Sequence, residues 1–521
     1  MEADPPLFTS LRAVVAVPPV RDFYFTRHRF SSLGAKTVNQ ILLNVGLQTT
    51  FLDFPLIVKH AKVVDFPQDI SYLKKHIVPG ETGSLSFFTK YQLFGPEPDE
   101  CAAKICALSP TVCFLSCFAY SYSEELLAIS RNIKKRSPHT FVVAGGAGVS
   151  AYPLYFIRDN SIDFAIVGEA ERSLPSFVST ITNNYLTFER VPNLFWKKNG
   201  IVQSPTAIEL AASETIEPVL SKTHETRNAV HFSTSLSRGC PKHCRFCSNS
   251  ISHGSRFRVA GLKRLEHAFN RLKIDENLSK KALFFNFEDD NLLLDPEYFL
   301  EIMAMISSRF PNARFLAENG VDHSLLSSGL ADRLIKAGLS GFNFTFGSAS
   351  DEVLSIQNRF HSSDRFASLV RHISGKGIGV LSYFIAGLKG DTKQNVVESL
   401  AFLGNLPTRI GISMFYAVPG LTDFRDTAIF DRLSPKMGNG SSAYPWNSTL
   451  TTAEIVTAFR LSRYINLLKS QKKSDLELRL IEEIKNEKKL FTLVNDNKAI
   501  TIVEVPDHDE EMVGLLLEQL E

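Results

Sequence analysis

Three cysteines, Cys240, Cys244 and Cys247, stand within one short segment, after an apolar strand-like run and before a helical one. A loop this short can wrap three sulfur atoms around one centre, but it cannot complete a site of four sulfurs by itself. A structural zinc ion would need a fourth protein ligand, for which His243 or His253 is available. A four-iron cluster would be held by the three thiolates and would leave one iron open to a substrate or cofactor.

The remaining cysteines, Cys101, Cys106, Cys113 and Cys117, lie far from this loop in the chain. Cys113 and Cys117 are four residues apart in an extended strand and therefore share one face, and free cysteine is commonly buried. We expect all four thiols to pack in a core, and an auxiliary cluster is the alternative. Seven cysteines in 521 residues do not make a disulfide scaffold.

Charge and hydropathy exclude several classes of protein. Lys and Arg number 57 against 55 for Asp and Glu, a net charge of +2, which argues against a nucleic-acid coat or a polybasic membrane binder. No apolar run approaches the roughly 18 residues of a membrane span, and no basic segment leads into an apolar stretch at the N-terminus. We therefore expect a cytoplasmic protein with neither membrane nor nucleic acid as a partner, and 521 residues suggest about three folded units.

Apolar strands alternate with helices over the first 190 residues. The strands are read from LRAVVAVPPV (11–20), TVCFLSCF (111–118), FVVAGGAG (141–148) and IDFAIVG (162–168). This alternation predicts an α/β domain over 1–190 with a doubly wound, Rossmann-like parallel sheet, which binds ligands beyond the carboxyl ends of its strands. Four residues at those ends are candidate cofactor contacts: Gly145, Gly146, Gly168 and Glu169.

The rest of the chain divides into three further segments. Residues 191–227 are predicted to form a hairpin, turning at Asn199 and Gly200, and then a linker. Residues 228–428 show about six strand–helix units, which predicts a partial (βα)6 barrel because a closed barrel has eight. Residues 429–521 are predicted to form an α-rich C-terminal cap, with helices at 452–470 and 474–489 and a possible small strand pair, that closes the open side of the barrel.

The spacing C-x3-C-x2-C, with Phe246 before the last cysteine, resembles the radical S-adenosylmethionine (SAM) superfamily. The resemblance implies a [4Fe–4S] cluster on Cys240, Cys244 and Cys247. It also implies that SAM binds at the carboxyl ends of the barrel strands, with Phe246 near the adenine. The strand-end candidates are Glu288 and Asp289 for the amino group of SAM, Glu318 and Asn319, Gly347 and Ser348, and Gly387.

Acids at strand ends have a simpler role as helix caps. We expect that role for Asp295 and Asp351, each of which stands before a predicted helix. For Glu288 and Asp289 the cofactor role is favoured only because the cysteine loop precedes them. The family's barrel geometry also makes Tyr416, at the end of the sixth strand, a candidate substrate contact by position alone.

An α/β domain ahead of such a barrel resembles the cobalamin-dependent subclass of the superfamily. The matching segments are SPHTFVVAGGAGVS (137–150) and IDFAIVGEAE (162–171), which follow the patterns P-x-x-x-V-V-x-G-G and D-x-x-V-x-G-E-x-E. One departure is that Asp-x-His-x-x-Gly, the motif that supplies an axial histidine, is absent. His28 follows the first strand but lacks the flanking Asp and Gly. The resemblance thus implies cobalamin bound without a protein histidine ligand.

The family resemblance implies a radical SAM enzyme that cleaves SAM reductively with an electron from a donor such as a flavodoxin or ferredoxin. With cobalamin, the leading hypothesis is methyl transfer to an unactivated carbon or phosphorus centre. One alternative is a radical SAM enzyme without cobalamin, in which the first domain serves substrate recognition. Another is a non-enzymatic zinc or iron–sulfur module for binding or electron transfer. Nothing in the sequence indicates the substrate.

Overall fold

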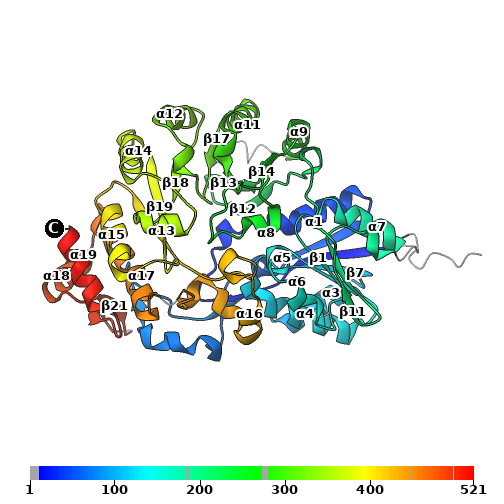
Figure 1. The fold of residues 1–521 in the computed structure, drawn as a ribbon, viewed down its shortest axis with the longest axis horizontal. Coiled ribbons are helices and arrows are strands. Elements are labelled where there is room, and N and C mark those ends of the chain that lie inside the picture. The colour runs from blue at the N-terminus through cyan, green and yellow to red at the C-terminus, as the bar shows by residue number, and fades with distance from the viewer. Residues whose placement is uncertain (1–10, 183–186, 273–279, 448, 497, 521) are drawn as a thin grey trace, which may run out of the picture.

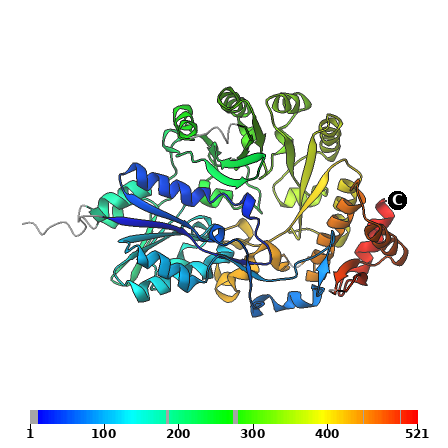
Figure 2. The ribbon, with the colours of Figure 1, turned by 180° about the vertical axis from the view of Figure 1, so that it is seen from behind.

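The computed structural model describes residues 11–182, 187–272, 280–447, 449–496 and 498–520. Three parts follow one another along the chain (Figure 1). An α/β domain comes first, a curved array of parallel strands with helices on its outer side comes second, and a group of helices with a small sheet stands at the far end of the array. Figure 2, from behind, shows the first domain and the strand array side by side.

The first domain is built on a seven-stranded sheet in which five neighbouring strands are parallel. In spatial order the strands are β11 (Ile201–Gln203), β10 (Leu194–Lys198), β9 (Phe164–Ile166), β8 (Phe141–Gly145), β7 (Val112–Ser116), β1 (Arg12–Val17) and β3 (Gln48–Asp53). One face is covered by α1 (Leu33–Asn44) and α7 (Ser173–Thr182), the other by α3 (Pro98–Ala107) and α4 (Ser123–Arg136). The predicted doubly wound sheet is confirmed.

The sequence of strand β1 does not alternate between apolar and polar residues, and the burial of both its faces explains why. Val14 and Ala16 belong to the core under α3 and α4, whereas Val15 and Val17 belong to the core under α1 and α7. A strand covered by helices on both faces has no side that faces water, so every position after the exposed Arg12 is apolar.

Several short elements complete the first domain. The helices are α2 (Phe54–Ile57), α5 (Ala147–Ala151) and α6 (Pro153–Ile157). A second, three-stranded sheet has the order β2 (Val20–Asp22), β6 (Gln92–Phe94) and β4 (Lys62–Val63). Of these, α5 and α6 pack on the main sheet, with Val149, Phe156 and Ile157 in the core that α3 and α4 cover.

The predicted hairpin at 193–204 forms and turns at Asn199 and Gly200. Their φ values of 52° and 78° are both positive, as a two-residue type I′ turn requires. Its first strand, β10, pairs antiparallel with β9, so the hairpin extends the sheet of the first domain rather than standing apart from it. The predicted linker after it is also partly ordered, because β12 (Ser221–Glu225) pairs antiparallel with β13 (Ala229–Thr234).

Six parallel strands form the second part, as predicted. Their order is β13, β16 (Ala282–Phe287), β17 (Ala313–Leu316), β18 (Gly341–Gly347), β19 (Gly379–Ala386) and β20 (Arg409–Met414). Two isolated parallel bridges, Phe315 with Leu339 and Val321 with Phe344, connect the half that ends at β17 to the half that begins at β18. Within the described ranges no pairing joins β20 to β12 or β13, so the barrel is partial.

Helices cover the outer side of this barrel (Figure 1). They are α9 (Leu262–Asn270), α11 (Pro296–Arg309), α12 (Ser328–Lys336), α14 (Ser363–Gly375) and α15 (Lys393–Gly404). The short helix α13 (Asp351–Ile356) lies instead at the end of the strands, on the side of the cysteine loop (Figure 1). Asp295 caps α11 as predicted, because its side chain accepts a hydrogen bond from Tyr298 N at 3.0 Å. The prediction for Asp351 is wrong. Ser350 caps α13, and Asp351 occupies the first helical position, where a carboxylate interacts favourably with the helix dipole.

The third part contains the predicted helices and strand pair. Its elements are α16 (Ala428–Arg432), α17 (Thr452–Leu468), α18 (Asp475–Glu487), β21 (Phe491–Asn495), β22 (Ile500–Glu504) and α19 (Glu510–Leu520), of which α16 and α19 were not predicted. A two-residue strand, β5 (Glu81–Thr82), comes from far upstream to pair with β21. The segment around β5 therefore connects the first part of the chain with the last.

Helix α17 covers the free edge of β20, which is how the C-terminal part closes one side of the barrel. The side chain of Asn466 donates to Ile410 O at 2.8 Å and accepts from Ile410 N at 2.9 Å. An uncovered edge strand has unpaired backbone N–H and C=O groups that can pair with another strand. The Asn466 side chain pairs with those of Ile410 instead. The same helix is fixed to the segment around β5 by a buried ion pair between Arg460 and Glu81.

Candidate active site

The cysteine loop is held at its two ends by a pair of short strands. Strand β14 (Ser237–Arg238) enters the loop and β15 (Arg258–Val259) leaves it, and the two pair antiparallel. Gly239, just before the first cysteine, has φ +82°, and a Cβ there would lie 2.1 Å from Arg256 O. Only glycine fits at this position, because any other side chain would collide with the backbone of the returning strand.

All three loop cysteines are free and half-buried, and two of them have a donor beside the sulfur. Asn291 Nδ2 lies 3.8 Å from Cys240 Sγ, and Arg359 Nη1 lies 3.8 Å from Cys244 Sγ. Burial, followed by the charge of Cys244, raises the pKa of the Cys247 thiol to about 11. A thiol in such a place remains protonated near neutral pH unless a metal displaces the proton, which suits a ligand rather than a nucleophile.

The sequence left two kinds of metal centre open, a zinc ion and an iron–sulfur cluster. The distances between the thiols distinguish between them. A single zinc bound at about 2.3 Å from each sulfur draws its ligand atoms to within roughly 4 Å of one another. Among the residues that the structure describes, the three Sγ atoms are not gathered within 4.8 Å. Neither His243 nor His253 is gathered with two of these sulfurs within that distance in the described residues, and His253 Nδ1 contacts Asp290 Oδ2 at 2.9 Å. The donor set fits a larger cluster better than zinc.

Two acids at the end of β16 fix the chain that leads into the loop. One oxygen of Asp289 accepts from Leu236 N at 3.0 Å, Ser237 N at 2.5 Å and Ser237 Oγ at 2.6 Å. Asp290 accepts from Gly239 N at 2.6 Å. Burial raises the pKa of Asp289 to about 7 despite these donors. Sequence reasoning placed these acids at the site but missed that they hold the cysteine loop in place.

Unpaired acceptors remain beside these contacts. The second oxygen of Asp289 and the side-chain oxygen of Asn291 are buried and have no hydrogen-bond donor in the described part of the chain. A buried acceptor without a partner costs free energy, so such atoms are commonly matched by a ligand. An ammonium group offers three donors, and the amino group of SAM is of this kind. The roles predicted for Glu288 and Asp289 in binding that group stay predictions.

The first domain reaches into the mouth of the barrel with residues that follow β2. Ser31 Oγ donates to Glu288 at 2.8 Å, and Arg29 Nε lies 3.2 Å from a carboxylate oxygen of Glu318. The backbone carbonyl of Glu318 accepts from Tyr383 OH at 2.6 Å. Burial, opposed by the Ser31 hydroxyl and Arg29, raises the pKa of Glu288. These contacts join the first domain to the barrel mouth, where Arg29 and Glu318 stay partly exposed.

A cavity of about 290 Å³ lies where the strand ends of the first domain meet the cysteine loop. Its first-domain wall includes Gly145, Gly146 and Gly168. The wall from the barrel side includes Arg238 and His253, which flank the three cysteines in the chain. The cavity thus opens at the carboxyl ends of the parallel strands, where doubly wound sheets bind their ligands, and it takes part of a bulky cofactor rather than the whole.

Family models match the two parts that form this cavity. The model of the Radical SAM superfamily matches residues 234–403, and the model of the B12 binding domain matches residues 90–178. The chain carries a B12-binding domain followed by a radical SAM domain. The first match spans the cysteine loop and the barrel as far as α15, and the second spans β7, β8 and β9 with their helices.

Curated relatives match part of the chain. An uncharacterized methyltransferase of Pyrococcus horikoshii is 24% identical over 289 residues, which cover 54% of this chain and 61% of the relative. A bacteriochlorophyllide d C-12(1)-methyltransferase of Chlorobaculum tepidum is 23% identical over 202 residues, which cover 38% of this chain and 42% of the relative. The chain spans about half the length of the curated relatives that it matches.

Two solved structures share the fold over most of the chain. The radical SAM methyltransferase TsrM of Kitasatospora setae, solved with cobalamin and a [4Fe–4S] cluster, has a TM-score of 0.57 at 16% identity, covering 79% of this chain and 76% of that one. The cobalamin-dependent SAM radical enzyme OxsB, solved with aqua-cobalamin and SAM, has a TM-score of 0.55 at 14% identity, covering 98% of this chain and 66% of that one. Both likenesses concern the fold.

The later strand ends of the radical SAM domain offer mainly backbone groups. Gly347 has φ +87°, and Ser348 is buried with its hydroxyl toward Ser399 at 3.4 Å, so this side chain turns away from the barrel mouth. Gly387 has φ +90°, and its N–H donates to Asp391 at 2.9 Å. Asn319 is exposed. The cofactor roles predicted for these residues stay predictions.

Two aromatic residues stand near the cysteines. Phe246 is half-buried within the loop, and its place beside the adenine stays a prediction. Tyr416 is 42% exposed, and desolvation together with the nearby Cys247 raises its pKa. Tyr416 lies just beyond β20 and thus faces the cluster side of the barrel, as its position in the sequence suggested, and a substrate contact remains a prediction for it.

The glycines of the B12-binding domain differ in what they allow. A Cβ on Gly146 would lie 2.4 Å from Cys117 O, and one on Gly148 would lie 2.7 Å from the backbone of Ala119. These two glycines let the chain pack against its own loop after β7. Gly145 has only Ile166 O nearby, at 3.6 Å, so it leaves room at the cavity. The predicted approach to a cofactor therefore applies best to Gly145.

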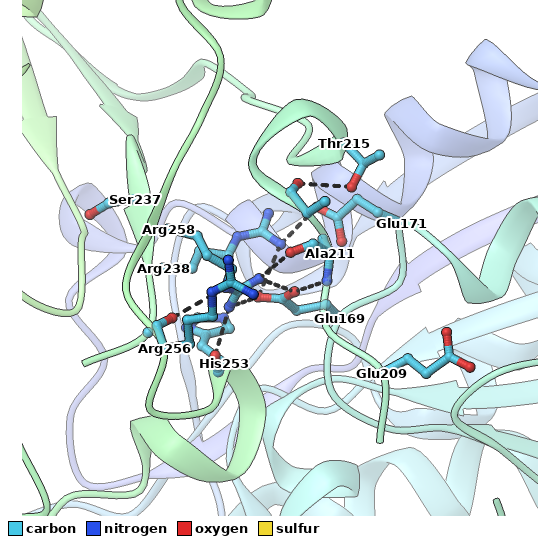
Figure 3. Close-up of polar contacts among 12 residues, drawn as sticks. Glu169, Glu171, Glu209, Ala211, Thr215, Ser237, Arg238, His253, Arg256 and Arg258 are labelled. Carbon is cyan, nitrogen blue, oxygen red and sulfur yellow. Dashed lines mark hydrogen bonds and ion pairs between the residues drawn. The ribbon is translucent and has the colours of Figure 1, made fainter. Parts of the chain in front are cut away.

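Glu169, one of the predicted cofactor residues, makes several hydrogen bonds to other residues of the chain (Figure 3). Its carboxylate accepts from both terminal nitrogens of Arg258, at 2.7 and 2.9 Å, and from Ala211 N at 2.6 Å. These donors belong to the radical SAM domain and to the segment before it. No direct contact with a cofactor is needed to explain why a carboxylate is buried here.

The other four cysteines lie in the B12-binding domain, where Cys101, Cys113 and Cys117 are buried in its core and Cys106 packs against it. Burial raises the pKa of each of the four. In the described ranges, the one set of metal-type side chains gathered within 4.8 Å is Glu504, His508 and Glu510, which contains no cysteine. The expectation that these four thiols pack is confirmed.

His28 does not face the cavity. It is exposed, and its ring lies 5.6 Å from that of His224, at the outer side of the domain interface.

In the described part of the chain no helix is long and apolar enough to cross a membrane.

Proposed function

We propose that this protein is a cobalamin-dependent radical SAM methyltransferase. The observation that carries the proposal is the shared cavity. Its walls combine strand ends of the B12-binding domain, such as Gly145 and Gly168, with Arg238 and His253 from either side of the cysteine loop. A cofactor held by the first domain would therefore stand against the loop that holds the cluster. When bound, the cluster and SAM supply radical chemistry, and cobalamin supplies the carrier for a methyl group.

The chain's own residues divide the work of binding. Cys240, Cys244 and Cys247 would hold three irons of the cluster and leave the fourth for SAM. The unpaired oxygens of Asp289 and Asn291 would accept from the amino group of SAM. Loop residues Arg29 and Ser31, which contact Glu318 and Glu288, would hold the B12-binding domain against the barrel mouth.

The names of the curated relatives support methyl transfer, because both the Pyrococcus and the Chlorobaculum proteins are methyltransferases. The acceptor would be an unactivated carbon or phosphorus centre. Cobalamin would bind without a histidine ligand from this chain, because His28 is exposed outside the cavity and His253, which lines it, is paired with Asp290. A flavodoxin or ferredoxin would supply single electrons, and the seven free thiols favour the cytoplasm as the compartment.

The proposal is tested by the products of SAM. Anaerobically reconstituted protein should contain about four irons per chain, and the reduced protein should cleave the C–S bond of SAM to give methionine and 5′-deoxyadenosine. Cys240→Ala should lose both the iron and the product. Stoichiometric zinc in place of iron, or four irons with no cleavage of SAM, would contradict the proposal and favour a binding or electron-transfer module.

A further inference from the structure

The two strands that flank the cysteine loop each carry an arginine that ends on a glutamate of the B12-binding domain (Figure 3). Arg258 of β15 makes two hydrogen bonds to Glu169, at 2.7 and 2.9 Å. Arg238 of β14 lies 2.7 Å from Glu171 and 3.8 Å from Glu169. The two glutamates are separated by one residue, so a single turn after β9 contacts both ends of the loop.

These contacts are shielded from water. The side chains of Glu169, Glu171 and Arg258 are at most 4% exposed, and that of Arg238 is 11% exposed. Paired charges in a dry site interact strongly, and a two-pronged contact between arginine and carboxylate fixes orientation as well as distance. Removal of one partner leaves the other charge buried without compensation, so the contacts depend on each other.

The same arginines are tied to the rest of the loop. Arg258 also donates to His253 O at 2.7 Å, at the end of α8 (Asn249–His253), the short helix that follows the third cysteine. Arg238 is followed directly by Gly239 and Cys240, and Gly239 N donates to Asp290 at 2.6 Å. Both the entry to the loop and the exit from it are therefore anchored through residues that reach the two glutamates.

We propose that Glu169 and Glu171 are positioning residues that hold the cysteine loop against the B12-binding domain and so fix the separation between cluster and cavity. Both oxygens of Glu169 already accept hydrogen bonds from the chain, which leaves a cofactor little to gain from this carboxylate. Both glutamates also line the cavity, so the residues that hold the loop are part of the wall that a cofactor would touch.

The proposal predicts that substitutions in the B12-binding domain change how firmly the cysteine loop holds its iron. Reconstituted, cobalamin-free protein with Glu169→Gln or Glu171→Gln should release iron to an excess of bathophenanthroline disulfonate at least fivefold faster than the wild type. Glu125→Gln is the matched control. Glu125 is also buried in the B12-binding domain and lies 3.5 Å from Arg21, but it contacts neither strand of the loop and does not line the cavity, so this variant should release iron at the wild-type rate.

A second pair of variants separates positioning from general damage. Arg238→Gln should accelerate iron release as Glu171→Gln does, and the double variant should be no worse than either single one, because the two side chains act through one contact. Full additivity, or wild-type iron release in the glutamate variants, would overturn the proposal. So would variants that keep their iron but no longer bind hydroxocobalamin, which would assign the glutamates to the cofactor. Should the wild type itself not bind hydroxocobalamin, the proposed function would lose its cobalamin, whereas the iron readout would still decide the role of the glutamates.

Discussion

Arg359 Nη1 lies 3.8 Å from Cys244 Sγ, although 115 positions separate the two residues in the chain. The guanidinium is held there by Thr345, whose carbonyl and hydroxyl oxygens both accept from Nη2 at 2.6 Å. A fixed positive charge beside a ligand thiolate stabilises the more negative, reduced state of a cluster. We therefore expect Arg359, on the loop that follows α13 and outside the cysteine motif, to influence the redox potential of a cluster bound there.

Arg359→Met should lower the midpoint potential of the reconstituted cluster, because the reduced state loses its neighbouring charge. We expect a fall of about 60 mV, which is roughly a tenfold change in the one-electron equilibrium. An anaerobic redox titration followed by electron paramagnetic resonance measures it. Arg365→Met, an exposed arginine on α14, is the control and should leave the potential where it was. A potential unchanged in Arg359→Met would contradict this assignment.

The two sets of cysteines should respond differently to substitution. Cys240→Ala, Cys244→Ala and Cys247→Ala should each retain far less iron than the roughly four per chain of the wild type, since each thiolate holds one iron. Cys113→Ala, in a buried strand of the B12-binding domain, should keep full iron and lose stability instead. Iron and sulfide analysis after anaerobic gel filtration measures both. Loss of iron in Cys113→Ala would show that the core thiols also serve as ligands.

Arg460 should matter for stability far more than an arginine on the surface. Its side chain and that of Glu81 are at most 1% exposed, so Arg460→Met leaves a carboxylate buried and unpaired. We expect a loss of about 3–5 kcal/mol in the free energy of unfolding. Arg333→Met breaks an exposed pair with Glu297 and should cost far less stability. Urea denaturation compares them, and equal losses would be the contrary result.

Asp391 should make stability depend on pH between about 4 and 7. Burial raises its pKa to about 7, although Gly387 N and Leu388 N donate to it. The folded protein therefore binds a proton that the unfolded chain releases above about pH 4, and stability falls as pH rises toward 7. In Asp391→Asn the slope of unfolding free energy against pH should be shallower by about 1 kcal/mol per pH unit. Identical slopes in the two proteins would refute the assignment.

Much of the fold can be predicted from sequence because its signals are local. The strand segment 13–17 is apolar throughout because both of its faces are buried, and Asn199 with Gly200 fits the positive φ values of its turn. The cysteine loop is likewise a short-range pattern. The error at Asp351 has the same origin, because Ser350 and Asp351 are adjacent residues that can both cap a helix, and sequence alone does not choose between them.

The contacts that assemble the site could not be predicted in this way. Arg29 meets Glu318 across 289 positions, and Arg258 meets Glu169 across 89. Nothing near either residue in the sequence marks its partner, because an arginine or glutamate on its own is far more often an exposed charge. The signal that could have been used is the pair of glutamates at 169 and 171, whose burial demands cations from elsewhere in the fold.

The central claim is that one cavity brings a cobalamin-binding domain against a cluster-binding loop. The most direct test is to produce the protein with cobalamin supplied and to record the absorbance of the protein peak after gel filtration. We predict a cobalamin spectrum that co-elutes with the chain at about one cofactor per protein and that persists in the cluster-free Cys240→Ala variant. A peak without cobalamin, from protein that still binds iron and cleaves SAM, would contradict the claim and leave a radical SAM enzyme whose first domain serves another purpose.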